Sequence, residues 1–328
     1  METIAFGDWH GNDLAALHAI EVAHYEFPNI KKYIHVGDFG FWDTRIFTNS
    51  FLRKVDESFA NNESFPTIED EDMRGYVAAV NRTLKKHDII LYVCLGNHEN
   101  YWELDETFGY WGAYVEQPVE YDSVTADNYT RPPTVKQKTY KGDSGRLYCT
   151  GMDKGILQKN AKLDEEGFIM SDLFSNIRII PRAHIWKWGD IQYASLGGAN
   201  SIDVAYRTRG ISWWEQESIL PEETDSLIEL CQGKDIDVLI THDGPIDVVN
   251  KLYGHGSKID RKTTEWGGRS GQQVQKAIRK ISPKVNVCGH HHVRKTDYTE
   301  NTRVEILDRD GSSIRGNRFI INKDRIQE

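Results

Sequence analysis

The stretch that sets the pattern of this chain reads Ile4-Ala5-Phe6-Gly7-Asp8-Trp9-His10-Gly11, a short apolar run that stops at a glycine-bounded turn. Four later apolar runs stop in the same manner, at Gly37-Asp38, Gly96-Asn97-His98-Glu99, Thr241-His242-Asp243-Gly244 and Gly289-His290-His291-His292. Short apolar runs that are rich in β-branched residues and bounded by glycine indicate buried strands. The sequence therefore predicts five strands, each followed by Asp, Asn or His.

Helical spacing of apolar residues fills the intervals between these runs. Asn12 or Asp13 can cap a helix, and further helical patterns occur around residues 73–86, from Pro221 onward and over residues 271–281. Strands that alternate with helices predict an α/β sandwich with the helices outside. Ligands of such sheets bind beyond the carboxyl ends of the strands. We therefore expect the polar residues that follow the five runs to form one site there.

Composition narrows the class of protein. The 328 residues include 40 Lys and Arg against 50 Asp and Glu, a formal net charge of −10, which argues against binding of long nucleic acid because that needs a basic surface. The sequence has no run of about 18 apolar residues, so it predicts no membrane span. The N-terminus lacks the pattern of a secretory signal. The four cysteines contain no CxxC pair and are too sparse for a disulfide scaffold. We expect a cytoplasmic protein.

The residues that follow the runs have the donor types of a transition-metal site. Carboxylates, imidazoles and one amide, without a thiolate, suit Mn, Fe, Zn or Ni. Asp8 and His10 are two positions apart, as are His290 and His292, and residues at this spacing point the same way in an extended chain. The complete set is too large for one tetrahedral ion and suits two ions that share a carboxylate; it comprises Asp8, His10, Asp38, Asn97, His242, His290 and His292.

The ordered motifs GDWHG, GD, GNHE, THDGP and GHHH resemble those of the calcineurin-like metallophosphoesterases. They extend from Gly7 to His292, which is most of the chain, and the ordered set is specific although each piece alone is weak. The resemblance implies a four-layered α/β/β/α sandwich with two central mixed β-sheets and a metal site at the C-terminal ends of the strands. It also implies hydrolysis of a phosphate ester by a hydroxide bound to a dinuclear metal centre, without a covalent phospho-enzyme.

The same resemblance assigns roles to individual residues. Asp8, His10 and His292 would hold the first ion, while Asn97, His242 and His290 would hold the second. Asp38 would bridge the two ions, and His98 would donate a proton to the leaving oxygen or help to hold the phosphate. The cofactor would be two divalent metal ions, with Mn²⁺ expected in vitro and Fe, Zn or Ni as alternatives. His291, between two ligands, is expected to point away from the ions, toward solvent or the sheet.

The chain departs from the phosphoprotein phosphatase branch of this family. That branch has Asp-Arg-Gly after its bridging Asp and an Arg after GNHE, whereas this chain has Phe39-Gly40 and Asn100-Tyr101. The missing arginines argue against phosphoserine or phosphothreonine hydrolysis and favour a phosphodiester. A glycine-rich stretch that begins at Gly197 supplies candidate substrate-binding residues, namely Asn200, Arg207 and Arg209.

We interpret residues 1–328 as one metallophosphoesterase domain with an insertion or cap at about 103–180. A hairpin of the second sheet is expected to comprise Ile177–Tyr193 and to turn at Gly189-Asp190. A further edge hairpin is expected over residues 304–321, followed by free terminal residues.

Three alternatives to a phosphodiesterase that acts on a small substrate stay open. They are a phosphomonoesterase or protein phosphatase, a nuclease acting on short or single-stranded nucleic acid, and a non-catalytic binding scaffold. A scaffold would be expected to lack some of the ligands, and none is missing. The sequence does not predict the oligomeric state.

Overall fold

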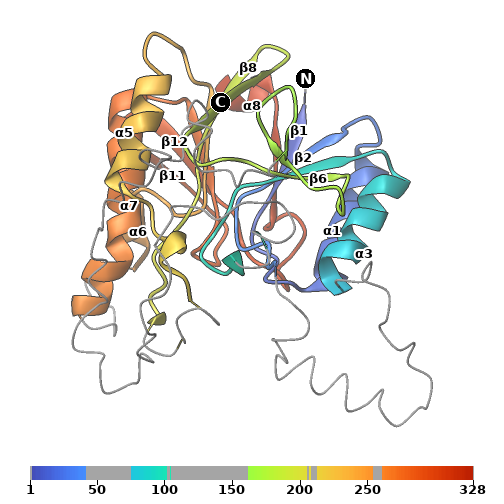
Figure 1. Cartoon of the computed structure of the whole chain (residues 1–328). Helices are drawn as coiled ribbons and strands as arrows, with labels where there is room; N and C mark the ends of the chain where they lie inside the picture. The colour runs from blue at the N-terminus through green and yellow to red at the C-terminus, as the bar shows by residue number, and fades with distance from the viewer. Residues whose placement is uncertain are drawn as a thin grey trace, which may run out of the picture.

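Two central β-sheets packed between two groups of helices form the core of the protein (Figure 1). The structure is a computed structural model, which describes residues 2–41, 75–101, 104, 162–204, 207, 213–253 and 261–327. Helices lie on the outer face of each sheet, so the layers follow the order α/β/β/α. The predicted four-layered sandwich with two mixed sheets is confirmed.

The seven-stranded sheet has the strand order β13-β1-β2-β3-β6-β5-β4. Strands β1, β2, β3 and β6 run parallel, and β13, β5 and β4 join them in antiparallel pairs. The bounds are β1 Thr3–Phe6, β2 Lys32–His35, β3 Ile90–Val93, β4 Lys162–Leu163, β5 Ile169–Met170, β6 Ile177–Ile179 and β13 Arg318–Ile321.

The six-stranded sheet has the order β11-β12-β10-β9-β8-β7. Its four inner strands run parallel, and β11 and β7 form antiparallel edges. The bounds are β7 His184–Trp188, β8 Ile191–Leu196, β9 Val238–Thr241, β10 Val285–Cys288, β11 Lys295–Thr299 and β12 Thr302–Ile306.

The helices divide between the two sheets. Helices α1 (Asp13–Glu26) and α3 (Gly75–Lys86) cover the seven-stranded sheet, while α5 (Pro221–Leu230), α6 (Ile246–Tyr253) and α7 (Arg261–Ile281) cover the six-stranded sheet. The 3₁₀ helix η3 (Glu215–Glu217) and helix α8 (Lys323–Gln327) complete the described elements. Asn12 caps α1, as predicted, by accepting a hydrogen bond from the backbone N–H of Ala15 at 3.2 Å.

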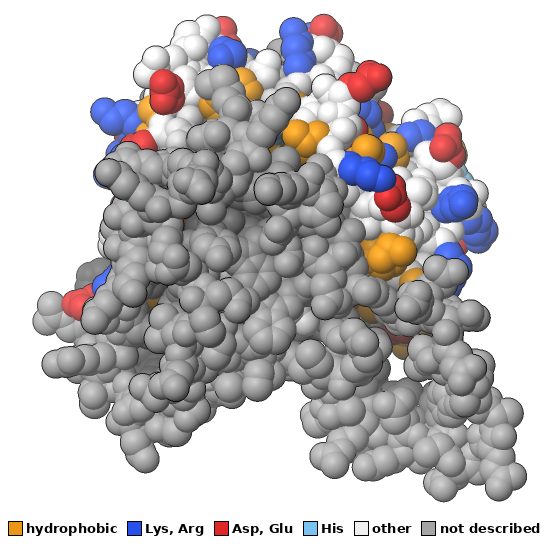
Figure 2. All heavy atoms as spheres, viewed as in Figure 1, with side chains coloured by type: hydrophobic (Ala, Val, Ile, Leu, Met, Phe, Trp, Pro, Cys, Tyr) orange, Lys and Arg blue, Asp and Glu red, His pale blue; other side chains and the backbone are white. Residues whose placement is uncertain are grey.

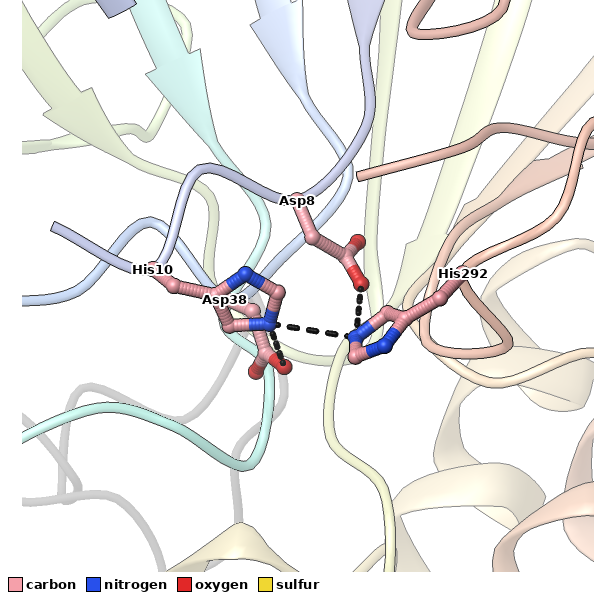
Figure 3. Close-up of side chains that lie close together, drawn as sticks. All are labelled: Asp8, His10, Asp38 and His292. Carbon is pink, nitrogen blue, oxygen red and sulfur yellow. Dashed lines mark hydrogen bonds and ion pairs between the residues drawn. The ribbon is translucent and has the colours of Figure 1, made fainter. Parts of the chain in front are cut away.

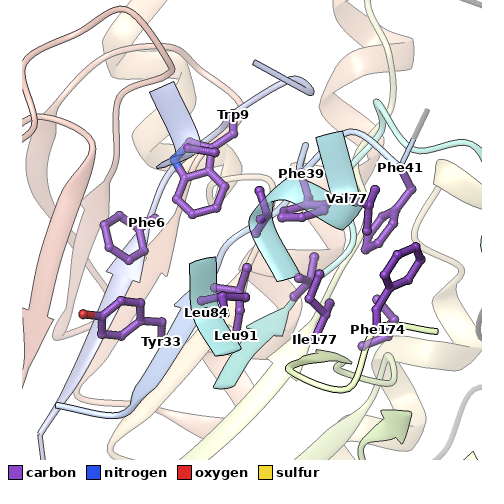
Figure 4. Close-up of a cluster of buried hydrophobic side chains, with 14 of the residues drawn as sticks. Phe6, Trp9, Tyr33, Phe39, Phe41, Val77, Leu84, Leu91, Phe174 and Ile177 are labelled. Carbon is purple, nitrogen blue, oxygen red and sulfur yellow. The ribbon is translucent and has the colours of Figure 1, made fainter. Parts of the chain in front are cut away.

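Alternation of side chains along the strands produces the layers. In β1, Ile4 and Phe6 face the helices, in the cluster drawn in Figure 4, while Ala5 faces the opposite sheet. In β9, Val238 and Ile240 likewise lie between the sheets. Because both faces of these strands are buried, nearly every position is apolar, which is why the sequence shows continuous apolar runs.

Parts of the connectivity differ from the sequence predictions. Strands β7 and β8 pair as a hairpin around Gly189-Asp190, as predicted, but β6 pairs with β3 in the other sheet. The expected hairpin over residues 304–321 is wrong, because β12 pairs with β10 and β11 whereas β13 pairs with β1. The terminal residues form α8, in which Ile326 is buried.

The predicted insertion at about 103–180 is described in part. From Lys162 onward it supplies β4, β5 and β6, which extend the seven-stranded sheet beyond β3. Residues 105–161 lie outside the described part of the chain.

The surface of the described residues carries charges of both signs. In Figure 2, Lys and Arg side chains are interspersed with Asp and Glu over the coloured part of the visible face. Among the described residues, no helix combines the length and hydropathy that crossing a bilayer requires.

Candidate metal centre

A first cluster of possible metal ligands gathers beyond the ends of β1, β2 and β10. It contains Asp8, His10, Asp38 and His292, whose ligand atoms all lie within 4.8 Å of one another (Figure 3). His10 Nε2 is 3.2 Å from His292 Nε2 and 3.4 Å from Asp38 Oδ2. His292 Nε2 is in turn 3.4 Å from Asp8 Oδ2. Two imidazoles and two carboxylates therefore point at one small volume.

A second cluster adjoins the first and contains Asp38, His242 and His290. His242 Nε2 lies 3.1 Å from Asp38 Oδ1 and 3.0 Å from Asn97 Oδ1. The Asn97 amide nitrogen donates to Ser201 Oγ at 2.9 Å, which directs the amide oxygen at the cluster. This cluster thus has the carboxylate, imidazole and amide-oxygen donors predicted for a second ion.

Asp38 belongs to both clusters. Its Oδ1 faces His242 and accepts the backbone N–H groups of Asn97 and His98 at 2.8 and 2.7 Å. Its Oδ2 faces His10 and has no hydrogen-bond partner, although Asp38 is 1% exposed. A buried carboxylate oxygen without a donor is costly, and a cation between the clusters would satisfy it. The residues present therefore fit a metal centre.

The electrostatics of the two clusters favour bound cations. Burial opposes ionisation of Asp38, but His242, His98 and His10 hold its pKa well below the usual value. Burial also opposes charge on His10 and His242, yet the carboxylates around them raise the pKa of His10 to about 10 and that of His242 to about 9. The negative potential of the site therefore retains protons on these histidines, and a divalent ion would compete with the protons for the same ligand atoms.

The backbone at the ligands is not extended. His10, Asp38, His290 and His292 have φ values of 49°, 54°, 66° and 53°, in the left-handed region. The expectation that spacing of two in extended chain aims paired residues at one ion is therefore wrong in its mechanism, and His290 and His292 lie in different clusters. Left-handed backbone at a non-glycine residue costs about 1–2 kcal/mol, and such strain concentrates at functional sites.

Glycine is required at positions 96 and 289 because the ends of neighbouring strands approach the ligands closely there. A Cβ atom at Gly96 would overlap the Asp38 carboxylate, and one at Gly289 would overlap the Asp8 carboxylate. Each glycine lies immediately before a ligand, so the backbone of one strand end can contact the ligand of another.

Hydrogen bonds on the far side of the histidines hold their rings. His10 Nδ1 donates to Asp310 Oδ1 at 2.8 Å, and His242 Nδ1 donates to the backbone oxygen of Val36 at 3.1 Å. With a proton on Nδ1, each ring turns the lone pair of Nε2 toward the cluster. The sequence analysis missed Asp310, which lies far from every motif.

His291 lies outside both clusters, but not in solvent. Its side chain is 6% exposed, with Nε2 3.0 Å from Asp243 Oδ1 and Nδ1 3.1 Å from the Tyr253 hydroxyl. The side chain lies outside the clusters, as expected, but it contacts α6 and the loop after β9 rather than solvent or the sheet.

Of the predicted catalytic and substrate-binding residues, His98 and Arg207 lie beside the clusters, whereas Asn200 is turned toward α7. Arg207 Nη2 lies 2.5 Å from His98 Nε2 and 3.2 Å from His98 Nδ1. The same His98 Nε2 is 4.0 Å from Asp38 Oδ2. Asn200 is buried, and its amide donates to the backbone oxygen of Trp266 at 3.1 Å, in the direction of α7. Arg209 lies outside the described residues.

No family model matches the chain, and no curated protein matches its sequence. Solved structures of similar fold include calcineurin-like metallophosphoesterases, the family indicated by the motifs.

Three of these structures illustrate the likeness. A proposed 5'-nucleotidase from Staphylococcus aureus is 14% identical, with 99% of this chain and 51% of that chain covered and a TM-score of 0.44. The protein TT1561 of Thermus thermophilus is 11% identical over 98% of each chain, with a TM-score of 0.40. The purple acid phosphatase PPD1 from yellow lupin seeds is 11% identical, with coverage of 93% and 43% and a TM-score of 0.37. This chain thus spans about half the length of the nucleotidase.

Proposed function

We propose that this chain is a metal-dependent phosphoesterase with a dinuclear metal centre. The observation that carries the proposal is the position of Asp38, whose two carboxylate oxygens face two separate clusters of ligands. Two divalent ions held in this way would act as Lewis acids that activate water and neutralise charge on a transferring phosphoryl group.

The donor set narrows the choice of ion. Imidazole nitrogens, carboxylate oxygens and the Asn97 amide oxygen line the clusters, and no cysteine belongs to either of them among the described residues. Donors of this mixture suit Mn, Fe, Zn or Ni. One ion would be held by Asp8, His10 and His292, and the other by Asn97, His242 and His290. Because the donor types suit Mn²⁺, we propose this ion as the first to test.

His98 and Arg207 are proposed to contact the phosphate group of the substrate. A guanidinium can only donate, so the His98 nitrogen nearest to Arg207 accepts, and the proton of a neutral ring is on the other nitrogen. Burial and the charge of Arg207 lower the pKa of His98 to about 4, which keeps the ring neutral near pH 7. We propose that Arg207 binds a phosphate oxygen and that the neutral His98 ring helps to hold the phosphate by donating a hydrogen bond from its N–H, without transferring the proton.

A phosphodiester is the proposed substrate. The described residues bring one guanidinium, that of Arg207, into contact with His98. A diester has a single negative charge, whereas a monoester dianion needs more positive charge around its oxygens. A matched series of aryl phosphate monoesters and diesters tests this preference.

The test of the proposed function is a panel of phosphate monoesters and diesters, assayed with Mn, Fe, Ni, Zn and Mg. Asp38→Asn removes the shared charge, and we expect kcat/KM to fall about 10³-fold, because several kcal/mol of charge stabilisation are lost. Asp13→Asn is the matched control, since Asp13 is exposed in the first turn of α1. Full activity of Asp38→Asn would contradict the assigned centre, and no turnover of any ester by the wild type would contradict the proposed function.

A further inference from the structure

A cavity of about 440 Å³ opens directly from the metal centre. Its inner end is formed by Asp38, Asn97, His98 and His290, and it extends from there between the loop at Ile202 and helices α6 and α7. This volume is within the range of small-molecule sites. A ligand that fills the cavity would therefore also contact residues of the clusters at its inner end.

Away from the centre, the cavity is lined by apolar side chains. Ile246, Val249 and Tyr253 contribute one wall from α6, and Ile202 faces the cavity from the loop after β8. Tyr253 and Ile202 are 50% and 46% exposed, so their apolar surfaces are available to a ligand.

Glycines of α7 form the opposite wall. Gly267, Gly268 and Gly271 all line the cavity, although each glycine in a helix costs about 1 kcal/mol relative to alanine. A Cβ at Gly268 would come within 3.2 Å of Ile246 Cδ1, and one at Gly267 would come within 2.7 Å of Ile202 Cγ2. The missing side chains thus let the backbone of α7 form a flat wall that approaches Ile246 and Ile202 closely, which keeps the cavity narrow at this point.

The aromatic wall is held in place from behind. The Tyr253 hydroxyl is hydrogen-bonded to His291 Nδ1 at 3.1 Å, and His291 Nε2 contacts Asp243 at 3.0 Å. Ser270 of α7 donates to the other oxygen of Asp243 at 2.7 Å. This chain of contacts joins α6, α7 and the loop of the metal ligands, so the ring is positioned relative to the centre.

The described lining of the cavity offers neither lysine nor arginine to an anionic alcohol portion of a substrate, and Asp203 and Asp243 are already paired with Arg207 and His291. The described lining residues include three aspartates, Asp38, Asp203 and Asp243, and neither Lys nor Arg. A pyrophosphate or nucleotide chain would have no cationic partner along this wall. At the inner end, by contrast, Asp38 Oδ2 is buried without a hydrogen-bond partner and faces His10 and His98, where ions and the phosphate would bind.

We propose that this cavity, which we call the leaving-group slot, binds a flat, apolar and preferably aromatic alcohol portion of the phosphate ester. This inference rests on the proposed function, because it places the phosphate at the inner end beside His98. It goes beyond that function by naming the class of substrate, a phosphate ester of an uncharged aryl or arylalkyl alcohol. Val249, Tyr253 and Gly268 are then specificity-determining residues.

The kinetic test compares benzyl with ethyl esters, each as the monoester and as the methyl diester, with Mn²⁺ present. Both groups leave as alkoxides, so that a difference in kcat/KM reports mainly on the slot. We expect the benzyl esters to be favoured about tenfold or more, since an apolar pocket discriminates by at least this factor for small apolar differences. Binding of benzylphosphonate against ethylphosphonate, measured by calorimetry, should show the same preference without turnover.

Variants separate the slot from the metal centre. Gly268→Leu fills the slot while improving helix propensity, so the benzyl-to-ethyl ratio should fall toward one. Gln272→Leu, at an exposed position of the same helix, is the matched control and should keep the ratio. Tyr253→Phe should keep the preference and Tyr253→Ala should lose it, because the ring rather than the hydroxyl contacts the ligand.

The outcomes distinguish this inference from the proposed function. Turnover of benzyl and ethyl esters at equal kcat/KM, unchanged in Gly268→Leu, would contradict binding of the alcohol portion in the slot. It would still support the proposed phosphoesterase activity. Absence of turnover with every ester and ion would overturn the phosphoesterase, and the slot as a leaving-group site with it. A benzyl preference that Gly268→Leu and Tyr253→Ala abolish, while Gln272→Leu retains it, would support both.

Discussion

At the scale of single residues, Asp310 shows how a distant carboxylate prepares a ligand. Its Oδ1 accepts from His10 Nδ1 at 2.8 Å and its Oδ2 accepts from Asn12 Nδ2 at 2.9 Å. The backbone N–H of Asp310 also donates to the backbone oxygen of Asp8 at 2.7 Å. Asp310 therefore orients one ligand side chain and holds the backbone of a second, without belonging to the clusters.

Replacing Asp310 should weaken metal binding more than it weakens the fold. We expect Asp310→Ala to lower affinity for the ion at His10 about 10–100-fold, as is typical when a carboxylate behind a ligating histidine is removed. Titration with Mn²⁺ followed by calorimetry measures this change. Asp308→Ala is the control, because that carboxylate accepts from the backbone of Arg309 nearby. Equal affinities of the two variants would contradict the role of Asp310.

At the scale of elements, the loops that follow β2 and β3 are joined by one buried carboxylate. Glu99 accepts the backbone N–H groups of Phe39 and Gly40 at 2.9 Å each, of Phe41 at 3.2 Å and of Gly96 at 3.3 Å. The first three belong to the loop of Asp38, and the last belongs to the loop of Asn97. Glu99 thus sets the spacing between the shared ligand and the amide ligand.

Removal of this carboxylate should destabilise the protein. Glu99→Ala leaves several buried N–H groups without an acceptor, at about 1–3 kcal/mol for a buried unsatisfied group, so we expect the free energy of unfolding to fall by about 3 kcal/mol. Glu99→Gln retains one acceptor oxygen and should lose less. Urea denaturation monitored by circular dichroism measures both, and an unchanged midpoint in Glu99→Ala would show that the loops do not depend on Glu99.

At the scale of the whole molecule, both metal clusters connect the two sheets. Asp8, His10 and Asp38 follow strands of the seven-stranded sheet, whereas His242, His290 and His292 follow strands of the six-stranded sheet. Each cluster contains residues from both groups. Bound ions would therefore link the sheets at one edge of the apolar layer between them.

Metal removal should accordingly lower the stability of the whole protein. An ion at about 100 times its Kd stabilises the folded state by about 2.7 kcal/mol for one site, so chelation should lower the melting temperature by several degrees. The shift should be much smaller in Asp38→Asn, which has lost the shared ligand. Differential scanning calorimetry with and without EDTA provides the measurement, and an equal shift in both proteins would contradict binding at this centre.

Much of the architecture is encoded in local pattern. Buried strands such as β1 and β9 appear as apolar runs because both of their faces are covered, and Asn12 indicates the start of α1 because a cap bonds within one turn. The seven ligand candidates were recognisable because each follows a strand, and parallel strands bring their carboxyl ends to the same edge. Asp38 and His242 illustrate this, since each lies within two residues of the end of such a run.

Other features depend on contacts between distant segments, which no local pattern records. Whether β6 pairs with β3 or with β7, and whether β13 joins β1 or β12, is set by which edges and apolar faces remain to be covered once the sheets have packed. Asp310 and the Tyr253–His291 contact likewise act across the fold, through hydrogen bonds between residues that are neighbours in space alone. Residue type and order thus specify the strands and their ligands, whereas the three-dimensional packing selects partners and shapes the slot, because burial and hydrogen bonding depend on proximity in space.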